Sequence, residues 1–441
     1  MRVLRHTDAD YATALQGLVA DSSLFDLKIE QRTRDIVEQV RSGGDAALVE
    51  LTARFDKARL TPAQLAVGPA EVRQAGRAID AEVRSAVALA RRNIQRFSKN
   101  SLRRNWSTRN AQGARVGEKF DPFRRVGVYI PGGTAPLVST ALMTILLAQV
   151  AGCPEIVVCT PCQPEGKINP ALLYAVSLAG ATEIYRVGGA QAIAALALGT
   201  ASILPVQKIF GPGNAYVVAA KRLLFGRAAI DLLPGPSEVL VLADDSADPE
   251  FASADLLAQA EHGSGEERVW LVTPSGRFLE RVEQAICRQL PLLSRRPAIE
   301  QALAKRGALI QVASLEEGIR LTNGLAPEHC EIMTRNPAKV AERITSAGAL
   351  FLGSWSPTVL GDYVAGPSHT LPTGGAGASF SGLTVDMFQR RTSVVIYDRA
   401  ALRRSMRAVA TFAQLEGLDA HGRSAAIRLD APKAGPGRSK R

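Results

Sequence analysis

Residues 125–131 read RVGVYIP, a short run rich in β-branched and aromatic residues that ends in proline. Three further runs share this composition: EIVVCTP (155–161), EIYRVGG (183–189) and KIFGPG (208–213). A helix-like segment follows each run, and these segments span 139–151, 169–179, 190–199 and 214–224. Strands that alternate with helices of this length are typical of a parallel sheet with helices on both faces. The stretch therefore predicts an α/β unit.

The alternation begins again at residue 238 and predicts a second α/β unit. Its expected strands are EVLVLAD (238–244), RVWLVT (268–273), ALIQV (308–312), CEIMT (330–334) and ALFLG (349–353). Residues 26–105 show apolar spacings of three and four, which indicate helices. We expect these helices to belong with the second unit, so that the first is inserted into it. The predicted fold class is α/β, with two Rossmann-like parallel sheets, one inserted in the other, and helical arms at both ends.

This organisation divides the chain into five parts. They are a helical N-terminal arm (1–25), an α/β domain (26–125 and 237–385), an inserted α/β domain (126–236), a C-terminal arm (386–430) and a disordered basic tail (431–441). The C-terminal arm has no predicted sheet of its own and carries apolar residues at helical spacing. They are Leu402, Met406, Val409, Phe412 and Leu415. This apolar face must be covered by the rest of the chain or by a partner.

Composition excludes several classes of protein. The chain is 46% hydrophobic and 22% charged, which is ordinary for a globular protein. Much of its net charge of +11 comes from the C-terminal tail, and its basic runs lack aromatic platforms, so we expect no nucleic-acid partner. The apolar run at 141–152 is too short to span a membrane, and the N-terminal segment lacks the apolar run of a signal peptide. Five cysteines, an odd number, indicate reduced thiols and a cytoplasmic protein.

Three polar residues lie at or just beyond the carboxyl ends of strands in the first unit: Tyr129, Gln191 and Asn214. Ligands bind at this edge of a parallel sheet, and adjacent glycines allow the backbone to approach closely. The pattern favours a nucleotide-sized ligand, although the glycines can also simply close tight turns. Neither GxGxxG nor a Walker sequence occurs, so the pattern does not identify the nucleotide.

Histidine is rare in this chain, with five residues, yet two histidines directly follow a glutamate. In DLLAQAEHG (255–263), Gln259 and His262 lie three residues apart on one helical face and carry donor atoms that zinc accepts. The alternative is that His262 only stabilises the helix end. In APEH (326–329), Glu328 and His329 enter a strand and together suit proton abstraction.

Two further polar residues belong to the second unit. Asp362 lies in GDYVAGPSHTLPTGGAG (361–377), which is too rich in glycine and proline for regular structure, and it is a candidate ligand with a hard oxygen. Ser237 directly precedes an expected strand, and His262 and the pair Glu328–His329 also precede strands. One sheet edge thus collects these residues, and it is the amino edge, against the usual rule.

Taken together, the ordered motifs resemble histidinol dehydrogenase. They are VYIPGGTAPL, GGAQAIAALALGT, GPGNAYV, PGPSEVL, AQAEH, APEH, GDYVAGPSHTLPT and EGLDAH, and the resemblance runs from about residue 30 to residue 430. It implies an NAD-dependent, zinc-containing oxidation of L-histidinol to L-histidine through L-histidinal, the last step of histidine biosynthesis. Two positions depart from the family pattern, Gly263 and Leu198, and neither is a ligand.

The resemblance implies a role for each matching residue. The implied zinc ligands are Gln259, His262, Asp362 and His421. The implied catalytic pair is Glu328 and His329. The implied substrate contacts are Ser237, Gln259, His262, His329, Asp362, Glu416 and His421. The implied NAD contacts are Tyr129, Gln191 and Asn214. The family forms homodimers, so His421 and Glu416 are expected to complete the site of the partner.

Two other functions remain open from the sequence. A related NAD-dependent dehydrogenase could act on another amino or sulfonated alcohol, although Glu416 and His421 look fitted to histidinol. A basic binding protein without catalysis is the second alternative, and it would have no reason to keep four zinc ligands.

Overall fold

The computed structural model describes residues 1–19, 26–132 and 136–430. They divide into two compact units, one formed by residues 1–102 and 123–388, the other by 103–122 and 389 onward. The expected basic tail at 431–441 lies outside the described residues, as do residues 20–25 of the expected N-terminal arm. Among the described residues, no helix combines the length and apolarity needed to cross a membrane.

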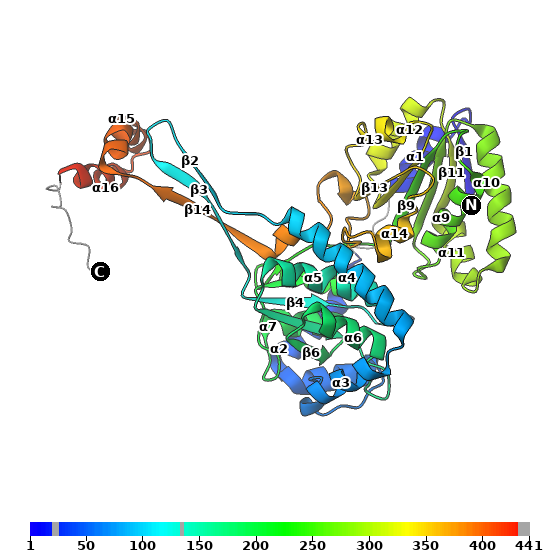
Figure 1. The fold of residues 1–441 in the computed structure, drawn as a ribbon, viewed down its shortest axis with the longest axis horizontal. Helices are drawn as coiled ribbons and strands as arrows, with labels where there is room; N and C mark the ends of the chain where they lie inside the picture. Colours follow the sequence, from blue (N-terminus) through cyan, green and yellow to red (C-terminus); the bar gives the residue numbers. More distant parts are fainter. Residues whose placement is uncertain (20–25, 133–135, 431–441) are drawn as a thin grey trace. The chain divides into compact units, whose positions relative to one another are not determined.

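The first unit contains a five-stranded parallel sheet in the order β6-β5-β4-β7-β8 (Figure 1). Its strands are β4 (Arg125–Tyr129), β5 (Glu155–Thr160), β6 (Glu183–Arg186), β7 (Lys208–Phe210) and β8 (Ala229–Ile230). The helices that alternate with them are α5 (Val138–Ala151), α6 (Pro170–Ala179), α7 (Gly189–Leu198) and α8 (Ala215–Leu224). These elements confirm the predicted alternation.

A six-stranded parallel sheet in the order β1-β11-β10-β9-β12-β13 completes the first unit. Its strands are β1 (Arg2–Arg5), β9 (Glu238–Ala243), β10 (Arg268–Thr273), β11 (Gly307–Gln311), β12 (His329–Met333) and β13 (Ala349–Leu352). Its helices are α1 (Tyr11–Val19), α9 (Pro249–Ala260), α10 (Gly276–Gln289), α11 (Arg296–Arg306), α12 (Leu315–Leu325), α13 (Pro337–Ala341) and α14 (Thr358–Tyr363). In sequence the five-stranded sheet lies between β1 and β9, so one sheet is inserted in the other, as the fold class predicted. The element that precedes the insertion is β1, from the expected N-terminal arm, rather than the helices of 26–125.

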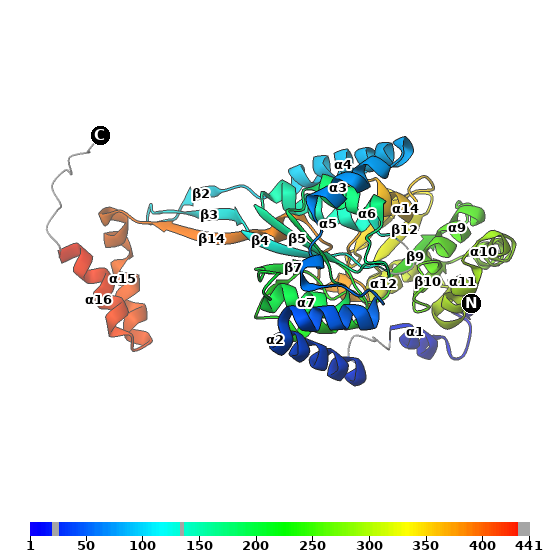
Figure 2. The same ribbon diagram turned by 90° about the horizontal axis from the view of Figure 1, so that it is seen from below.

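Helices cover both faces of each sheet. Figure 1 shows α9, α10 and α11 on one face of the six-stranded sheet and α1, α12 and α13 on the other, in agreement with its two apolar clusters. Figure 2 shows α2 and α7 on one side of the five-stranded sheet and α3 to α6 on the other. The inner strands of both sheets, β4, β5, β9, β10 and β12, are therefore buried almost throughout, as near-continuous apolar strands of a parallel sheet require.

The helices between residues 27 and 101 pack differently from our expectation. They are α2 (Leu27–Phe55), α3 (Pro69–Ala78) and α4 (Ala81–Ser101). We expected 26–125 to join the domain of 237–385. Instead, Leu48 and Leu51 of α2 share an apolar cluster with Tyr129 of the five-stranded sheet, and Ile94 of α4 joins a cluster on its other face. An amphipathic pattern specifies an apolar face but not the sheet that this face covers.

The second unit contains an antiparallel sheet that the sequence pattern did not predict. Its order is β14-β3-β2, formed by β2 (Trp106–Arg109), β3 (Arg115–Pro122) and β14 (Gln389–Ile396). Two helices follow, α15 (Arg399–Leu415) and α16 (Asp419–Asp430). The C-terminal arm, expected at 386–430, therefore starts at 389 and includes 103–122. None of the side chains of these strands is buried, so they lack the alternation of buried and exposed residues that identifies a strand.

Candidate functional site

The backbone of Glu238 holds Glu328 and His329 together at the amino ends of β9 and β12. These two strands are neighbours, with His329 opposite Val239. The Glu238 N–H donates to Glu328 Oε2 over 2.7 Å, and the Glu238 carbonyl lies 2.9 Å from His329 Nδ1. Both side chains are buried, with 5% of Glu328 and 4% of His329 exposed. The pairing register of the sheet thus fixes a carboxylate beside an imidazole, with Glu328 Oε2 and His329 Nδ1 3.5 Å apart.

The contacts of His329 define its tautomer. Because a carbonyl only accepts hydrogen bonds, Nδ1 carries the proton that reaches the Glu238 carbonyl. His329 Nε2 then faces Asp362, whose Oδ1 lies 3.6 Å away. Burial alone would lower the pKa of His329, but the carboxylates of Glu328 and Asp362 outweigh it and raise this pKa well above its usual value.

The Glu238 side chain connects the pair to the glycine-rich loop at 361–377. Its Oε1 lies 3.1 Å from a guanidinium nitrogen of Arg268 and accepts the Gly374 N–H over 2.8 Å. Burial raises the pKa of Glu238 to about 7, with the charge of Arg268 acting in the opposite direction. The sequence pattern did not identify Glu238 as a site residue, because its backbone and its carboxylate both act through residues distant in the chain.

Asp362 lies on α14 and faces two histidines. Burial disfavours its charged form, but a hydrogen bond and the charge of His329, with smaller effects of His369 and His262, hold its pKa below the usual range. His369 Nδ1 lies 3.0 Å from the Asp362 carbonyl, and Nε2 lies 3.1 Å from Thr140 Oγ1 of α5. The loop that carries Asp362 is thereby attached to the helix that follows β4.

Gln259 and His262 lie at the end of α9, as the helical spacing suggested. Gln259 is 2% exposed, and His262 Nδ1 lies 3.0 Å from the Gln259 carbonyl. In the described part of the chain, no three histidine, cysteine, aspartate or glutamate side chains are grouped to hold a metal. The four expected zinc ligands include the amide of Gln259 and also His421, which belongs to the second unit. Only two of them, His262 and Asp362, are therefore histidine, cysteine, aspartate or glutamate residues of the first unit.

The remaining expected site residues fall in two places. Ser237 directly precedes β9, on the same sheet edge as Glu328 and His329. Glu416 caps the C-terminal end of α15, and His421 lies in α16. Glu416 and His421 thus belong to the second unit.

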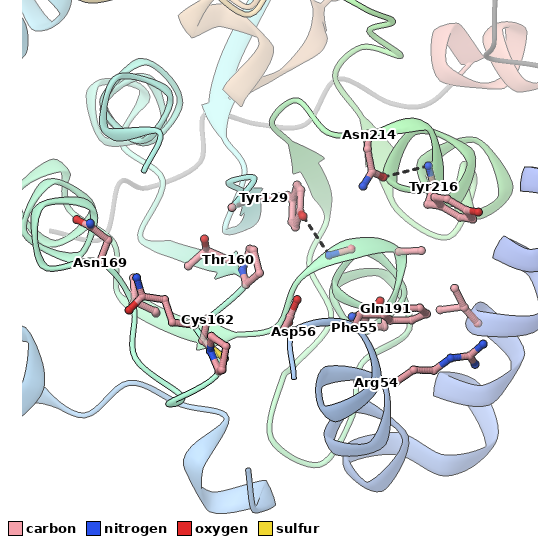
Figure 3. Close-up of a pocket in the computed structure, with 18 of the residues that line it drawn as sticks. Arg54, Phe55, Asp56, Tyr129, Thr160, Cys162, Asn169, Gln191, Asn214 and Tyr216 are labelled. Carbon is pink, nitrogen blue, oxygen red and sulfur yellow. Dashed lines mark hydrogen bonds between the residues drawn. The ribbon is translucent and has the colours of Figure 1, made fainter. Parts of the chain in front are cut away.

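A pocket of about 980 Å³ lies at the carboxyl edge of the five-stranded sheet and is lined by Tyr129, Gln191 and Asn214 (Figure 3). Tyr129 ends β4, and its hydroxyl accepts the Gly189 N–H at the start of α7 over 3.0 Å. Burial raises the pKa of this hydroxyl to about 12. Gln191 is 1% exposed, and its Nε2 has no hydrogen-bond partner in the described structure. Asn214 caps α8 by accepting from the N–H groups of Tyr216 and Val217.

The pocket also contains residues that the sequence reasoning missed. The end of α2 contributes Arg54, Phe55 and Asp56, and the segment after β5 contributes Cys162. Burial raises the pKa of Asp56 to about 6. The positions of Arg54, Phe55 and Asp56 in the pocket could not be predicted because α2 was expected on the other sheet.

Together, the two parallel sheets, the buried Glu328–His329 pair and the ligand-sized pocket are features of an α/β enzyme. The sequence model of the family described as histidinol dehydrogenase matches residues 21–429, and the chain belongs to this family. It is accordingly an oxidoreductase.

Relatives and a solved structure agree with this assignment. A histidinol dehydrogenase of Syntrophotalea carbinolica is 43% identical over 97% of this chain and 99% of its own. One from Geobacillus kaustophilus is 46% identical over 90% of this chain and 93% of its own. The crystal structure of histidinol dehydrogenase from Elizabethkingia anophelis has a TM-score of 0.93 and is 36% identical, with 98% of each chain covered.

Proposed function

We propose that this chain oxidises L-histidinol to L-histidine through L-histidinal in the cytoplasm, with two NAD as oxidants and zinc in the site. One L-histidinol, two NAD⁺ and one water would give L-histidine, two NADH and three protons. The observation that carries the proposal is the buried Glu328–His329 pair, with both members held by the Glu238 backbone. Such a pair can move protons twice in one catalytic cycle.

His329 is the proposed base for the alcohol step. Its Nδ1 proton is engaged by the Glu238 carbonyl, so the ring in its neutral form accepts a proton at Nε2. Zinc bound at Asp362 would oppose the rise that this carboxylate causes in the pKa of His329 and would so favour the neutral ring. The hydroxyl proton of histidinol would move to Nε2 as the carbinol carbon loses hydride. Since the ring is buried and fixed by the sheet, little reorientation is needed before the transfer.

Glu328 is the proposed base for the aldehyde step. Its Oε2 is engaged by the Glu238 N–H, which fixes the plane of the carboxylate. The second carboxylate oxygen would take a proton from a water that attacks the aldehyde carbon. The resulting hydrate anion would lose its hydride to the second NAD and its remaining hydroxyl proton to water, which leaves the carboxylate of histidine.

A zinc ion fits the residues proposed to hold it. Gln259, His262 and Asp362 offer an amide oxygen, an imidazole nitrogen and a carboxylate oxygen, all of which zinc accepts. The influence of His262 on the pKa of Asp362 supports their proximity. His421 would supply the fourth donor. Zinc, when bound, would hold the imidazole and amino nitrogens of the substrate, whose other proposed contacts are Ser237 and Glu416.

NAD fits the pocket of the five-stranded sheet. The pocket lies along the carboxyl ends of the strands and reaches the segments after β4 and β7, the neighbouring strands between which the strand order reverses. Such sheets bind nucleotides at this point, and the first turns of α7 and α8 reach the pocket. The unpartnered, buried Nε2 of Gln191 is a donor available to a ligand. NAD, when bound, would accept hydride, and Tyr129 and Asn214 would orient it.

The proposal includes a homodimer in which the arms complete the sites. Apolar side chains of the second unit support a partner: Phe412 is 62% exposed, Leu415 76% and Ile427 53%. Large exposed apolar residues on adjacent helices mark interaction surfaces. In this dimer, Glu416 and His421 of one copy would serve the other copy.

Stoichiometry tests the proposal. Purified protein with limiting L-histidinol and excess NAD should form two NADH per histidinol, with histidine as the product on chromatography. Related amino alcohols serve as controls for the substrate. Failure to form NADH, accumulation of histidinal after one NADH, or a higher kcat/KM for another amino alcohol would contradict the proposal.

A further inference from the structure

Lys221 of α8 and Asp231 after β8 form an ion pair that is entirely enclosed in the first unit. Both side chains are 0% exposed. A lysine is almost never buried unless its charge is paired, because its desolvation costs several kcal/mol. Its Nζ also lies 3.4 Å from the Leu232 carbonyl. The pair is thus a costly feature, placed in a sheet whose other interior side chains are largely apolar.

Both charges hold the same residue, Gly211, which directly follows β7. Lys221 Nζ donates to the Gly211 carbonyl over 2.6 Å, and the Gly211 N–H donates to Asp231 Oδ2 over 2.7 Å. The lysine and the aspartate therefore act as a clamp on the two polar groups of one residue. We call this arrangement, formed by Lys221, Asp231 and Gly211, the Gly211 clamp.

Gly211 needs such support because its backbone is in an unusual place. Its φ is +109°, and a Cβ at this position would lie 2.0 Å from the Tyr129 carbonyl oxygen. The loop thus presses directly on the last residue of β4. Three residues later, Asn214 caps α8, and two helical turns after Asn214 the same helix supplies Lys221. The clamp therefore links the end of β4, the end of β7 and α8 to one another.

Two of the residues linked in this way, Tyr129 and Asn214, line the pocket, whereas Lys221 and Asp231 do not. The clamp cannot contact a ligand in the pocket directly. Figure 3 shows Tyr129 and Asn214 among the residues that surround the pocket, on β4 and at the start of α8. A shift of Gly211 would move both.

We infer that Lys221 and Asp231 are positioning residues for NAD binding, through their hold on Gly211. This inference rests on the proposed function, in which the pocket takes NAD. The buried pair should affect the binding of NAD and not that of histidinol. Loosening the clamp should therefore weaken NAD binding and leave histidinol and metal binding unchanged.

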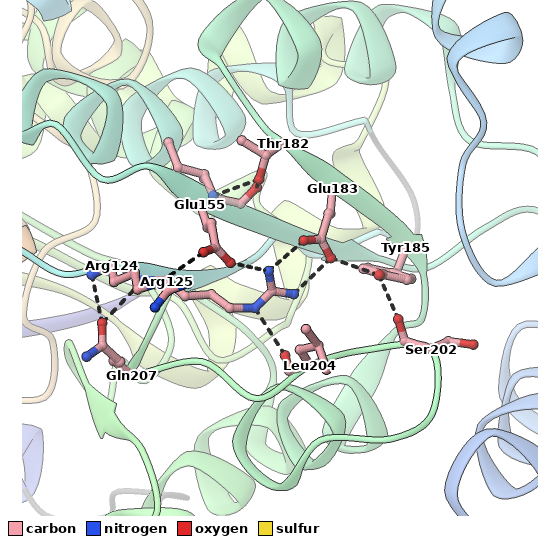
Figure 4. Close-up of polar contacts among 10 residues, drawn as sticks. Arg124, Arg125, Glu155, Thr182, Glu183, Tyr185, Ser202, Leu204 and Gln207 are labelled. Carbon is pink, nitrogen blue, oxygen red and sulfur yellow. Dashed lines mark hydrogen bonds and ion pairs between the residues drawn. The ribbon is translucent and has the colours of Figure 1, made fainter.

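A matched control exists at the opposite edge of the same sheet. Arg125 at the start of β4 is bound by Glu183 at the start of β6, with Nη1 and Nη2 2.5 and 2.8 Å from its two carboxylate oxygens (Figure 4). Nη1 also donates to Glu155 of β5 over 2.8 Å. None of these three residues lines the pocket. Breaking this network should lower the stability of the same sheet and leave the positions of Tyr129 and Asn214 unchanged.

The test compares Lys221→Met/Asp231→Leu with Arg125→Met and the wild type. The double variant leaves neither charge alone in the interior. Titration calorimetry with NAD should give a dissociation constant about tenfold higher in the double variant, as expected for the loss of one or two well-placed hydrogen bonds. The Michaelis constant for NAD should rise with it, whereas that for histidinol and the zinc content should stay within about twofold of wild type. Arg125→Met should bind NAD as the wild type does, with a lower unfolding temperature.

Amide exchange of the wild type provides a second measurement that needs no variant. The Gly211 N–H should exchange as slowly as the amides inside β7, because its acceptor Asp231 is fully buried. Rapid exchange there would overturn the inference even if the double variant does not fold. Unchanged NAD affinity in a folded double variant, or an equal loss in Arg125→Met, would also overturn it. A wild type that binds NAD but forms no NADH from histidinol would contradict the proposed function and leave the clamp supported.

Discussion

Replacing Glu328 with glutamine should separate the two oxidation steps. The variant Glu328→Gln keeps an oxygen that can accept the Glu238 N–H, which lies 2.7 Å from Oε2 in the wild type. The buried position should therefore remain filled and hydrogen-bonded, and the unfolding temperature should change little. What the variant loses is the ability to take a proton from water.

The expected loss follows from the role of a general base. Such a group contributes about 10²–10⁴-fold to the step that uses it, which corresponds to about 3–5 kcal/mol of transition-state stabilisation. Because His329 keeps its Nδ1 contact to the Glu238 carbonyl, it can still serve the alcohol step. We expect that step to slow by less than about tenfold and aldehyde oxidation to slow by at least about a hundredfold.

Stopped-flow measurement of NADH resolves the two steps. With enzyme and NAD in excess over histidinol, the variant should form one NADH rapidly and the second slowly, whereas the wild type forms both without a pause. Supplied histidinal should show the full defect in the variant. Equal losses in both phases, or a larger loss in the first, would refute the division of work between the two residues.

Three further outcomes are expected. His262→Asn removes one of four proposed ligands, so zinc affinity should fall more than about tenfold with little change in folding; full zinc content and activity after chelator treatment would contradict this. Burial raises the pKa of Asp56 to about 6, so the folded state holds this proton more tightly than the unfolded chain. As the pH rises from about 4 to about 6, the wild type should therefore lose stability relative to Asp56→Asn, measured by urea unfolding without NAD. A stability difference that stays constant over this range would contradict the raised pKa. Refolding His329→Asn together with His421→Asn should recover roughly a quarter of wild-type activity, given statistical pairing in a two-fold dimer; no recovery from mixed dimers would exclude shared sites.

The order and type of most elements of the first unit could be predicted, because buried parallel strands appear as short apolar runs between helices. The strands RVGVYIP and EIVVCTP became β4 and β5, and the helices after them begin within a residue or so of expectation. The partner of α2 could not be predicted, because its periodicity is equally compatible with either sheet. β14 and β3 could not be predicted because none of their side chains is buried, so that no alternation of apolar and polar residues is required.

The candidate site was predicted in parts rather than as an assembly. The motifs at Glu328 and His329 pointed to proton transfer, but sequence gave no sign that Glu238 holds both through its backbone. The link depends on the register of β9 against β12, some ninety residues later in the chain. Similarly, α12 ends at Leu325, beyond Gly324, and its C-cap residue Ala326 is in the left-handed region (φ +46°). Only the tertiary structure determines such positions.

The pairing of β1 with β11 has a consequence for how the chain folds during synthesis. Arg2 lies opposite Ala308 and Arg5 opposite Gln311, so β1 can pair with β11 only after roughly three hundred further residues have been made. The five-stranded sheet, by contrast, needs only strands between residues 125 and 230. Domains generally fold as units while a ribosome is still elongating the chain. Residues 2–5 therefore leave the ribosome as an unpaired strand, and we expect chaperone binding at this segment until residues 307–311 have been made.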